Sequence, residues 1–398
     1  MNPDLAHLHP YPFEKLAQLK AGCTPPEDMP HIALSIGEPK HPTPGFITEA
    51  VIEHLHGLSS YPTTAGTIEL RHTIATWLDN RFQLAGNIDA NTQVLPVNGT
   101  REALFAFAQA VIDRTTSAPL VIMPNPFYQI YEGAAILAGA HPYFLNCTAD
   151  NNFVPDFSSV SADVWDRCQL LYLCSPGNPT GAVIDQATLT TLIDLAHKHD
   201  FIIASDECYS EIYFDDEQPP VGLLQAAIAA GYTDSSHCVV FHSLSKRSNA
   251  PGLRSGFVAG DAKVLKDFLR YRTYHGCAMP PATQAASIVA WNDEEHVAYN
   301  RQLYREKFKA VLAILSPVMN VSLPEAGFYL WAETPTSDTE FARRLFDEKN
   351  VTVLPGSFLA RDNNNANPGS NRIRMALVAP IEECINAAHR ISDLIKNS

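Results

Sequence analysis

Several polar residues of this sequence follow directly after short apolar runs of the kind that form buried strands. Lys246 comes shortly after the run 238–241 and is the only lysine between residues 199 and 262. Asp206, with Tyr209 three residues later, follows a second run, and Asn178 lies in Ser-Pro-Gly-Asn-Pro-Thr-Gly after a third. Taken singly, these residues also fit a loop lysine, a helix N-cap and a tight turn. The carboxyl ends of parallel strands meet at one edge of a sheet, so together they predict a ligand site.

A fourth segment, Asn98-Gly-Thr-Arg-Glu102, follows the run 94–97 and is expected to open a helix. The free N–H groups at a helix start bind anions, although an ordinary capped helix would have the same sequence pattern. The amine, the carboxylate, the hydroxyl and amide donors and the anion site together match the needs of pyridoxal phosphate. Its aldehyde bonds to an amine, its ring nitrogen pairs with a carboxylate, and its phosphate takes amides, hydroxyls and an arginine.

The run Ser243-Leu-Ser-Lys246-Arg-Ser-Asn-Ala-Pro-Gly-Leu-Arg254-Ser-Gly256 resembles the lysine signature of class I/II aminotransferases. These are pyridoxal-phosphate enzymes of fold type I, and the resemblance extends over nearly the whole chain. It includes Ser35-Ile-Gly37-Glu-Pro, Tyr61…Gly66…Leu70-Arg71, Ser205-Asp206-Glu-Cys-Tyr209 and Arg372-Ile-Arg374.

The resemblance implies a role for each matching residue. Lys246 would bond to the aldehyde, and Asp206 would pair with the ring nitrogen. Arg374 would bind the substrate α-carboxylate as a bidentate fork. The other residues implied to contact the cofactor are Asn178 and Tyr209 at the ring oxygen, Tyr128 against the ring, and Gly99, Thr100, Arg101, Ser243, Ser245 and Arg254 around the phosphate. Gly37 would approach the carboxylate, and Tyr61 would reach the phosphate of a neighbouring subunit, which implies a homodimer.

Within the family, the segments 247–260 and 271–281 resemble those of the succinyldiaminopimelate aminotransferases of lysine biosynthesis. Such an enzyme takes glutamate as amino donor and an N-succinyl-2-amino-6-oxopimelate as acceptor. Because these substrates carry several carboxylates, a cation beyond Arg374 is expected, and Arg272 is the candidate. The alternative is that Arg272 is an ordinary surface arginine with no role in binding. An aspartate- or alanine-type aminotransferase and a carbon–sulfur lyase of the same fold remain open. A non-catalytic regulator is disfavoured because no basic helix-turn-helix segment comes before the domain.

The elements that must position these residues alternate between strands and helices. Strands are expected at 92–97, 120–123, 170–174, 201–205 and 238–241, with helices at 99–112, 127–137 and 186–199 between them, which predicts an α/β fold with a mostly parallel sheet. The resemblance gives that sheet seven strands. After residue 280 we expect a helix over 282–314 interrupted near 292–295, a helix at 339–348, a closing helix from 381, and strands at 318–322, 328–332, 351–354 and 372–377. The expected division is an arm at 1–40 packed on the small domain, a large domain at 41–285 and a small α+β domain at 286–398.

Composition excludes other classes of protein. The net charge of −15 argues against nucleic acid or an anionic membrane as a partner. Eight cysteines without a CxxC pair, together with the absence of a signal-like or long apolar segment, indicate a cytoplasmic protein with reduced thiols. The scattered histidines form no metal motif, so no metal is expected. The expected partners are therefore an amino acid and a 2-oxo acid.

Overall fold

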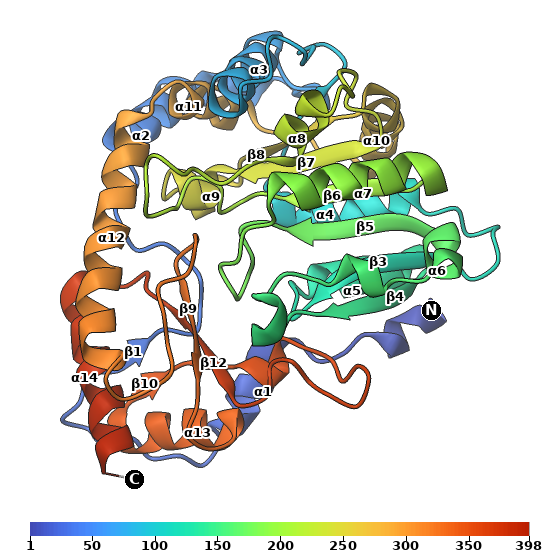
Figure 1. Ribbon diagram of the computed structural model, residues 1–398. Coiled ribbons are helices and arrows are strands. Elements are labelled where there is room, and N and C mark those ends of the chain that lie inside the picture. The colour runs from blue at the N-terminus through green and yellow to red at the C-terminus, as the bar shows by residue number, and fades with distance from the viewer. Residues whose placement is uncertain (398) are drawn as a thin grey trace.

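The computed structural model describes residues 1–397. Its centre is a seven-stranded sheet in the order β2-β8-β7-β6-β5-β3-β4, in which only β8 runs antiparallel to its neighbours (Figure 1). The strands are β2 (Val94–Val97), β3 (Leu120–Asn125), β4 (His141–Asn146), β5 (Cys168–Cys174), β6 (Ile202–Asp206), β7 (Cys238–Ser243) and β8 (Gly256–Gly260). The α/β class and the mostly parallel seven-stranded sheet are confirmed.

Helices cover both faces of this sheet, so the strand residues are buried on both sides. One face packs against α3 (Ile68–Phe82), α6 (Ala162–Arg167), α7 (Gln186–His199), α8 (Leu223–Ala229) and α11 (Pro281–Trp291). The other face packs against α4 (Thr100–Val111), α5 (Ile130–Ala138) and α10 (Ala262–His275). The short α9 (Leu244–Arg247) follows β7, and α2 (Gly45–Glu53) packs on α11. This arrangement leaves the carboxyl ends of β5, β6 and β7 free to carry a site.

A second apolar core lies in the lower half of Figure 1, around a three-stranded antiparallel sheet in the order β11-β12-β9. Its strands are β9 (Tyr329–Glu333), β11 (Leu354–Pro355) and β12 (Arg372–Ala376), and its helices are α12 (Glu295–Leu315), α13 (Asp338–Lys349) and α14 (Ile381–Lys396). The arm, which carries α1 (Pro12–Leu19), adds β1 (Ile32–Ala33) in parallel to β10 (Val351–Thr352). The boundaries expected at residues 40 and 285 stay a prediction.

Two differences from the expected elements have physical reasons. No strand forms at 318–322, where Met319 and Val321 fill the second core from a loop instead. Strands β4 and β8 were not expected from local pattern, because β4 is a partly exposed edge strand with a proline and β8 begins and ends in glycine. The break between α11 and α12 falls where it was expected.

Candidate active site

A pocket of about 470 Å³ lies at the carboxyl ends of β5, β6 and β7, and side chains from the arm and the second core close it. The expected site residues that line it are Gly37, Thr100, Arg101, Tyr128, Asn178, Asp206, Tyr209, Ser243, Ser245, Lys246, Arg254 and Arg374. Gly99 lies beside them at the start of α4. The structure therefore brings together residues that are up to 337 positions apart in the chain, from Gly37 to Arg374.

Lys246 lies on α9, immediately after β7, and its Nζ donates to the Gly37 carbonyl oxygen at 2.5 Å. The pKa of this amine is lowered to about 8, mainly by burial and in part by the nearby guanidinium groups of Arg374 and Arg254, against the opposing influence of Cys208 and Glu38. A lysine with a lowered pKa carries a larger fraction of free amine at neutral pH. Lys246 is therefore prepared to act as a nucleophile or a base.

Asp206 ends β6 and is 4% exposed. Its carboxylate accepts hydrogen bonds from the Tyr131 hydroxyl at 2.7 Å and from the Cys208 backbone N–H at 3.3 Å. Burial raises the pKa of Asp206, while these hydrogen bonds oppose the increase. A buried carboxylate that has no cationic partner in the described chain is suited to hold a proton on a ring nitrogen.

The start of α4 forms an anion cradle with the loop around Arg254. No side chain caps this helix start, so its backbone N–H groups stay free. Gly99 has φ +86°, and a Cβ added to it would lie 2.3 Å from an Arg254 Nη. The hydroxyl of Ser243 donates to that of Ser245 at 3.0 Å on the adjoining turn. Amides, hydroxyls and a guanidinium thus gather where a phosphate group would fit.

Arg374 projects from β12 into the opposite side of the pocket. One Nη donates to Asn178 Oδ1 at 2.9 Å, the other donates to the Ser35 carbonyl oxygen at 2.7 Å, and Nε is buried without a partner in the described chain. Its guanidinium lies 4.4 Å from the ring centroid of Tyr329, whose hydroxyl pairs with that of Tyr209 at 2.9 Å. This oriented fork, free of any carboxylate among residues 1–397, is suited to bind a substrate carboxylate.

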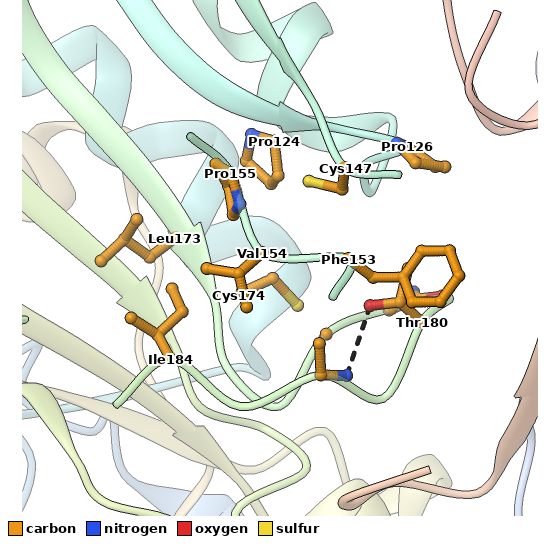
Figure 2. Close-up of a pocket in the computed structure, with 13 residues that line it drawn as sticks. Pro124, Pro126, Cys147, Phe153, Val154, Pro155, Leu173, Cys174, Thr180 and Ile184 are labelled. Carbon is orange, nitrogen blue, oxygen red and sulfur yellow. Dashed lines mark hydrogen bonds between the residues drawn. The ribbon is translucent and has the colours of Figure 1, made fainter. Parts of the chain in front are cut away.

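A small apolar cavity lies beside the loop that carries Asn178 (Figure 2). Leu173, Cys174 and Ile184 lie on one side of the cavity, and Val154 and Phe153 come from the segment before β5. The volume of the cavity, about 20 Å³, has room for one water molecule at most, so the walls pack closely around it. Asn178 is one of the residues that line this cavity, and its Oδ1 also accepts from Arg374 at 2.9 Å.

Two predicted residues do not reach the pocket of this chain. Arg272 is 1% exposed on α10, and one of its Nη atoms donates to both carboxylate oxygens of Glu102, at 2.8 and 2.9 Å. Because Glu102 also accepts from the Asn98 N–H at 3.0 Å, Arg272 braces the start of α4 and is not free for a substrate carboxylate. Tyr61 is fully exposed, at 103%, and is not among the residues that line the pocket of its own chain.

The structure also adds pocket residues that sequence reasoning missed. Tyr329 supports Arg374, and Tyr131 holds Asp206. From the arm, Tyr11 and Phe13 line the pocket, and the Tyr11 ring lies 5.5 Å from the guanidinium of Arg101. Only the backbone of Arg101 was expected to take part, yet its exposed side chain lines the pocket. No sequence signal marks these residues, because each meets its partner only through the tertiary fold.

A family model described as aminotransferase class I and II matches residues 30–391. The chain belongs to this family. Its members depend on pyridoxal phosphate, so the chain is a pyridoxal-phosphate-dependent aminotransferase. The uncapped helix start, the Gly99 cradle beside Arg254, the buried Asp206 and the free amine of Lys246 together fit that cofactor.

Similar proteins support the family. An LL-diaminopimelate aminotransferase of Aquifex aeolicus is 33% identical, with 97% of each chain covered. The crystal structure of an aminotransferase from Neisseria meningitidis is 51% identical with a TM-score of 0.94, covering 99% of this chain and 100% of that one. The aminotransferase AspB of Helicobacter pylori is 36% identical with a TM-score of 0.90, covering 98% and 100%. Among residues 1–397, no helix is both long and apolar enough to cross a membrane.

Proposed function

We propose that this aminotransferase moves an amino group between glutamate and the keto group of N-succinyl-2-amino-6-oxopimelate, giving succinyldiaminopimelate. The observation that carries this proposal is the charge of the pocket. Lys246, Arg254, Arg374 and Arg101 line it, against Asp206 as its one carboxylate among the lining residues. In a chain of net charge −15, this local excess of cations favours ligands with several anionic groups.

The chain's own residues divide the chemistry. Bound pyridoxal phosphate would supply an electron sink for the bond that breaks at the substrate Cα. Lys246 would hold the cofactor through its aldehyde, and once the substrate's amino group had taken that place, the released amine would move the proton from Cα. Asp206 would hold the ring nitrogen protonated, while Asn178 and Tyr209 would donate to the ring oxygen and Tyr128 would stack on the ring.

The phosphate of the cofactor and the α-carboxylate of the substrate would be bound on opposite sides of the pocket, by Arg254 and Arg374. The α4 start, with Ser243, Ser245 and Arg254, would hold the phosphate. Arg374 would bind the α-carboxylate close to the Gly37 backbone, where an added Cβ would collide with the Tyr329 hydroxyl. This arrangement leaves the other end of the substrate to face the arm.

The second cation for a long acceptor is Arg101 rather than Arg272. Its side chain is exposed, lines the pocket and has no carboxylate partner in the described chain, whereas Arg272 is neutralised by Glu102. Tyr11 and Phe13 of the arm provide an apolar wall beside it. We therefore assign the distal or succinyl carboxylate to Arg101.

Free LL-diaminopimelate is the second candidate substrate, because several curated relatives at 29–33% identity are named LL-diaminopimelate aminotransferase. Both candidates share the carbon chain on which the amino group moves, and they differ in the N-succinyl group. The deciding experiment measures kcat/KM with 2-oxoglutarate for succinyldiaminopimelate, free LL-diaminopimelate, aspartate and alanine. A preference for aspartate or alanine would contradict both candidates.

Arg101→Gln tests the assignment of the second cation, with Arg270→Gln on the exposed surface as the matched control. A charge-assisted hydrogen bond contributes about 1.5–3 kcal/mol, so kcat/KM for the long substrate should fall about 10- to 150-fold. The value for alanine, which has no distal carboxylate, should stay within about twofold. Equal losses for both substrates would refute this role of Arg101.

We also propose that the chain acts as a homodimer in which Tyr61 completes the partner's phosphate site. Tyr61 ends a stretch with three other exposed apolar residues, Ile52, Leu55 and Leu58, at 62%, 47% and 72%. Clustered exposed apolar side chains of this kind mark interaction surfaces. Sedimentation of Leu58→Glu should show monomers that bind the cofactor more weakly, and a monomeric wild-type enzyme would refute the proposal.

A further inference from the structure

The turn that carries Lys246 is tied to the corner between α11 and α12. Arg247, 2% exposed, donates to the backbone carbonyls of Ala290 and Asp293 at 2.6 and 3.1 Å. The next residue, Ser248, pairs through its hydroxyl with His296 Nε2 at 2.8 Å. Lys246 and Asn249 both bond to Asn300, so each of four consecutive residues is attached to this corner.

Asn300 is the point where three segments meet. It is 2% exposed on α12, and its Nδ2 donates to the backbone carbonyl of Lys246 at 3.3 Å. Its Oδ1 accepts from Asn249 Nδ2 at 3.1 Å and from His41 Nδ1 at 2.8 Å. Donor and acceptor are both used, and the partners come from the lysine turn and from the segment that follows the arm.

That segment also reaches the lysine turn directly. The Gly37 carbonyl accepts from Lys246 Nζ, and the Thr43 hydroxyl donates to the Asn249 carbonyl at 2.6 Å. Residues 37–43 therefore contact the lysine turn at the side chain, at the backbone and through Asn300. Helix α12 extends from this corner toward the second core along one side of the molecule (Figure 1).

The lysine turn needs such support because α9 is only four residues long. A helix of this length is not stable by itself, so contacts from outside must fix its backbone. The direction of the Lys246 backbone decides where its Nζ lies relative to Gly37 and Asp206. Asn300 does not line the pocket, so it can affect the chemistry only through this turn and through the segment 37–43 that it holds against the turn.

We propose that Asn300 is a positioning residue for Lys246: it fixes the backbone of the lysine turn against α12 and the segment 37–43. This role concerns the reaction of every substrate, because Lys246 serves both half-reactions. It therefore goes beyond the proposed acceptor and can be tested with glutamate alone.

The experiment compares Asn300→Leu and Asn300→Ala with Tyr304→Phe in full-length enzyme. Tyr304 lies one helical turn after Asn300, is fully buried, and its hydroxyl has no hydrogen-bond partner in the described chain. Tyr304→Phe therefore controls for changes in α12 packing. Circular dichroism and thermal melting establish that each variant folds, and Asn300→Ser serves if the first two do not.

Three measurements distinguish positioning from stability. The first is the pH dependence of Lys246 acylation in the cofactor-free protein, followed by mass spectrometry. The second is the rate at which the cofactor's visible absorbance appears on mixing with protein. The third is the single-turnover rate constant of the glutamate half-reaction, with its half-saturating glutamate concentration. A misplacement near 1 Å costs about 100-fold in rate, so we expect this rate constant to fall about 10- to 100-fold, with the half-saturating glutamate concentration within about threefold.

The acylation midpoint of the Asn300 variants should also move upward from that of wild type, because a loosened lysine turn admits water to the amine. Tyr304→Phe should match wild type in all three measurements. If the folded Asn300 variants lose only melting temperature, while the half-reaction rate constant, cofactor capture and the acylation midpoint stay at wild-type values, the proposal is wrong. The outcome is independent of the acceptor panel, since no diaminopimelate compound is used.

Discussion

The pKa of Lys246 gives the sharpest test of the site. Burial lowers it from the ordinary 10.5 to about 8. At pH 7 a lysine of pKa 8 is about one tenth neutral, whereas one of pKa 10.5 is only about 0.03% neutral. The buried amine should therefore capture pyridoxal phosphate about 300-fold faster than an exposed lysine of equal nucleophilicity.

Stopped-flow mixing of cofactor-free protein with pyridoxal phosphate, at a series of pH values from 7 to 11, measures this directly. The rate should rise about fivefold between pH 7 and 8, then about twofold more before it levels off, because only the neutral amine reacts. Lys246→Ala should give no visible signal, and free N-acetyl-lysine should show a midpoint near its ordinary value of about 10.4.

A matched variant tests the cause of the shift. The Glu38 carboxylate raises the pKa of Lys246 against the larger effect of burial, so Glu38→Gln should lower the midpoint further. A wild-type midpoint of 10 or above would refute the argument from burial. An upward shift in Glu38→Gln would refute the stated electrostatics.

Further predictions concern residues around and outside the pocket. Arg272→Ala should leave the carboxylate of Glu102, which is 29% exposed, without its partner and destabilise the protein by about 1–3 kcal/mol in urea unfolding, with KM for the substrates unchanged in the remaining folded enzyme. Gly99→Ala should weaken cofactor binding in an equilibrium titration without abolishing folding, because its Cβ would press on Arg254. Burial lowers the pKa of Lys307 to about 8, so between pH 8 and 10.5 the unfolded chain binds more protons and stability should rise with pH. Lys307→Met should flatten that rise in melting temperature, and an unchanged slope would contradict it.

The pattern of apolar residues along the sequence predicted the buried strands and the amphipathic helices. The buried parallel strands and α7 were found because apolar runs and helical periodicity identify them within a few residues. The antiparallel β8 was missed because glycine at both ends gives no strand signal. The segment 318–322 was expected to be a strand, but its apolar residues fill the second core from a loop.

The family motif predicted which residues surround the pocket, but not how they pair. Arg272 and Glu102 are 170 positions apart, so nothing local shows that one neutralises the other. Tyr329 lies under Arg374 only because β9 and β12 pair in antiparallel register. That Arg101 has no carboxylate partner in the described chain can likewise be seen only when the carboxylates around it have been located in three dimensions.

The pairing of β1 with β10 has a consequence for synthesis on the ribosome. Ile32 is among the first residues to leave the exit tunnel, but its partner Val351 is made more than 300 residues later. The segment that follows β1, including Gly37, therefore cannot settle until almost the whole chain has emerged. A nascent or truncated chain lacks that wall of the lysine site, so the cofactor becomes fully held only when translation is nearly complete.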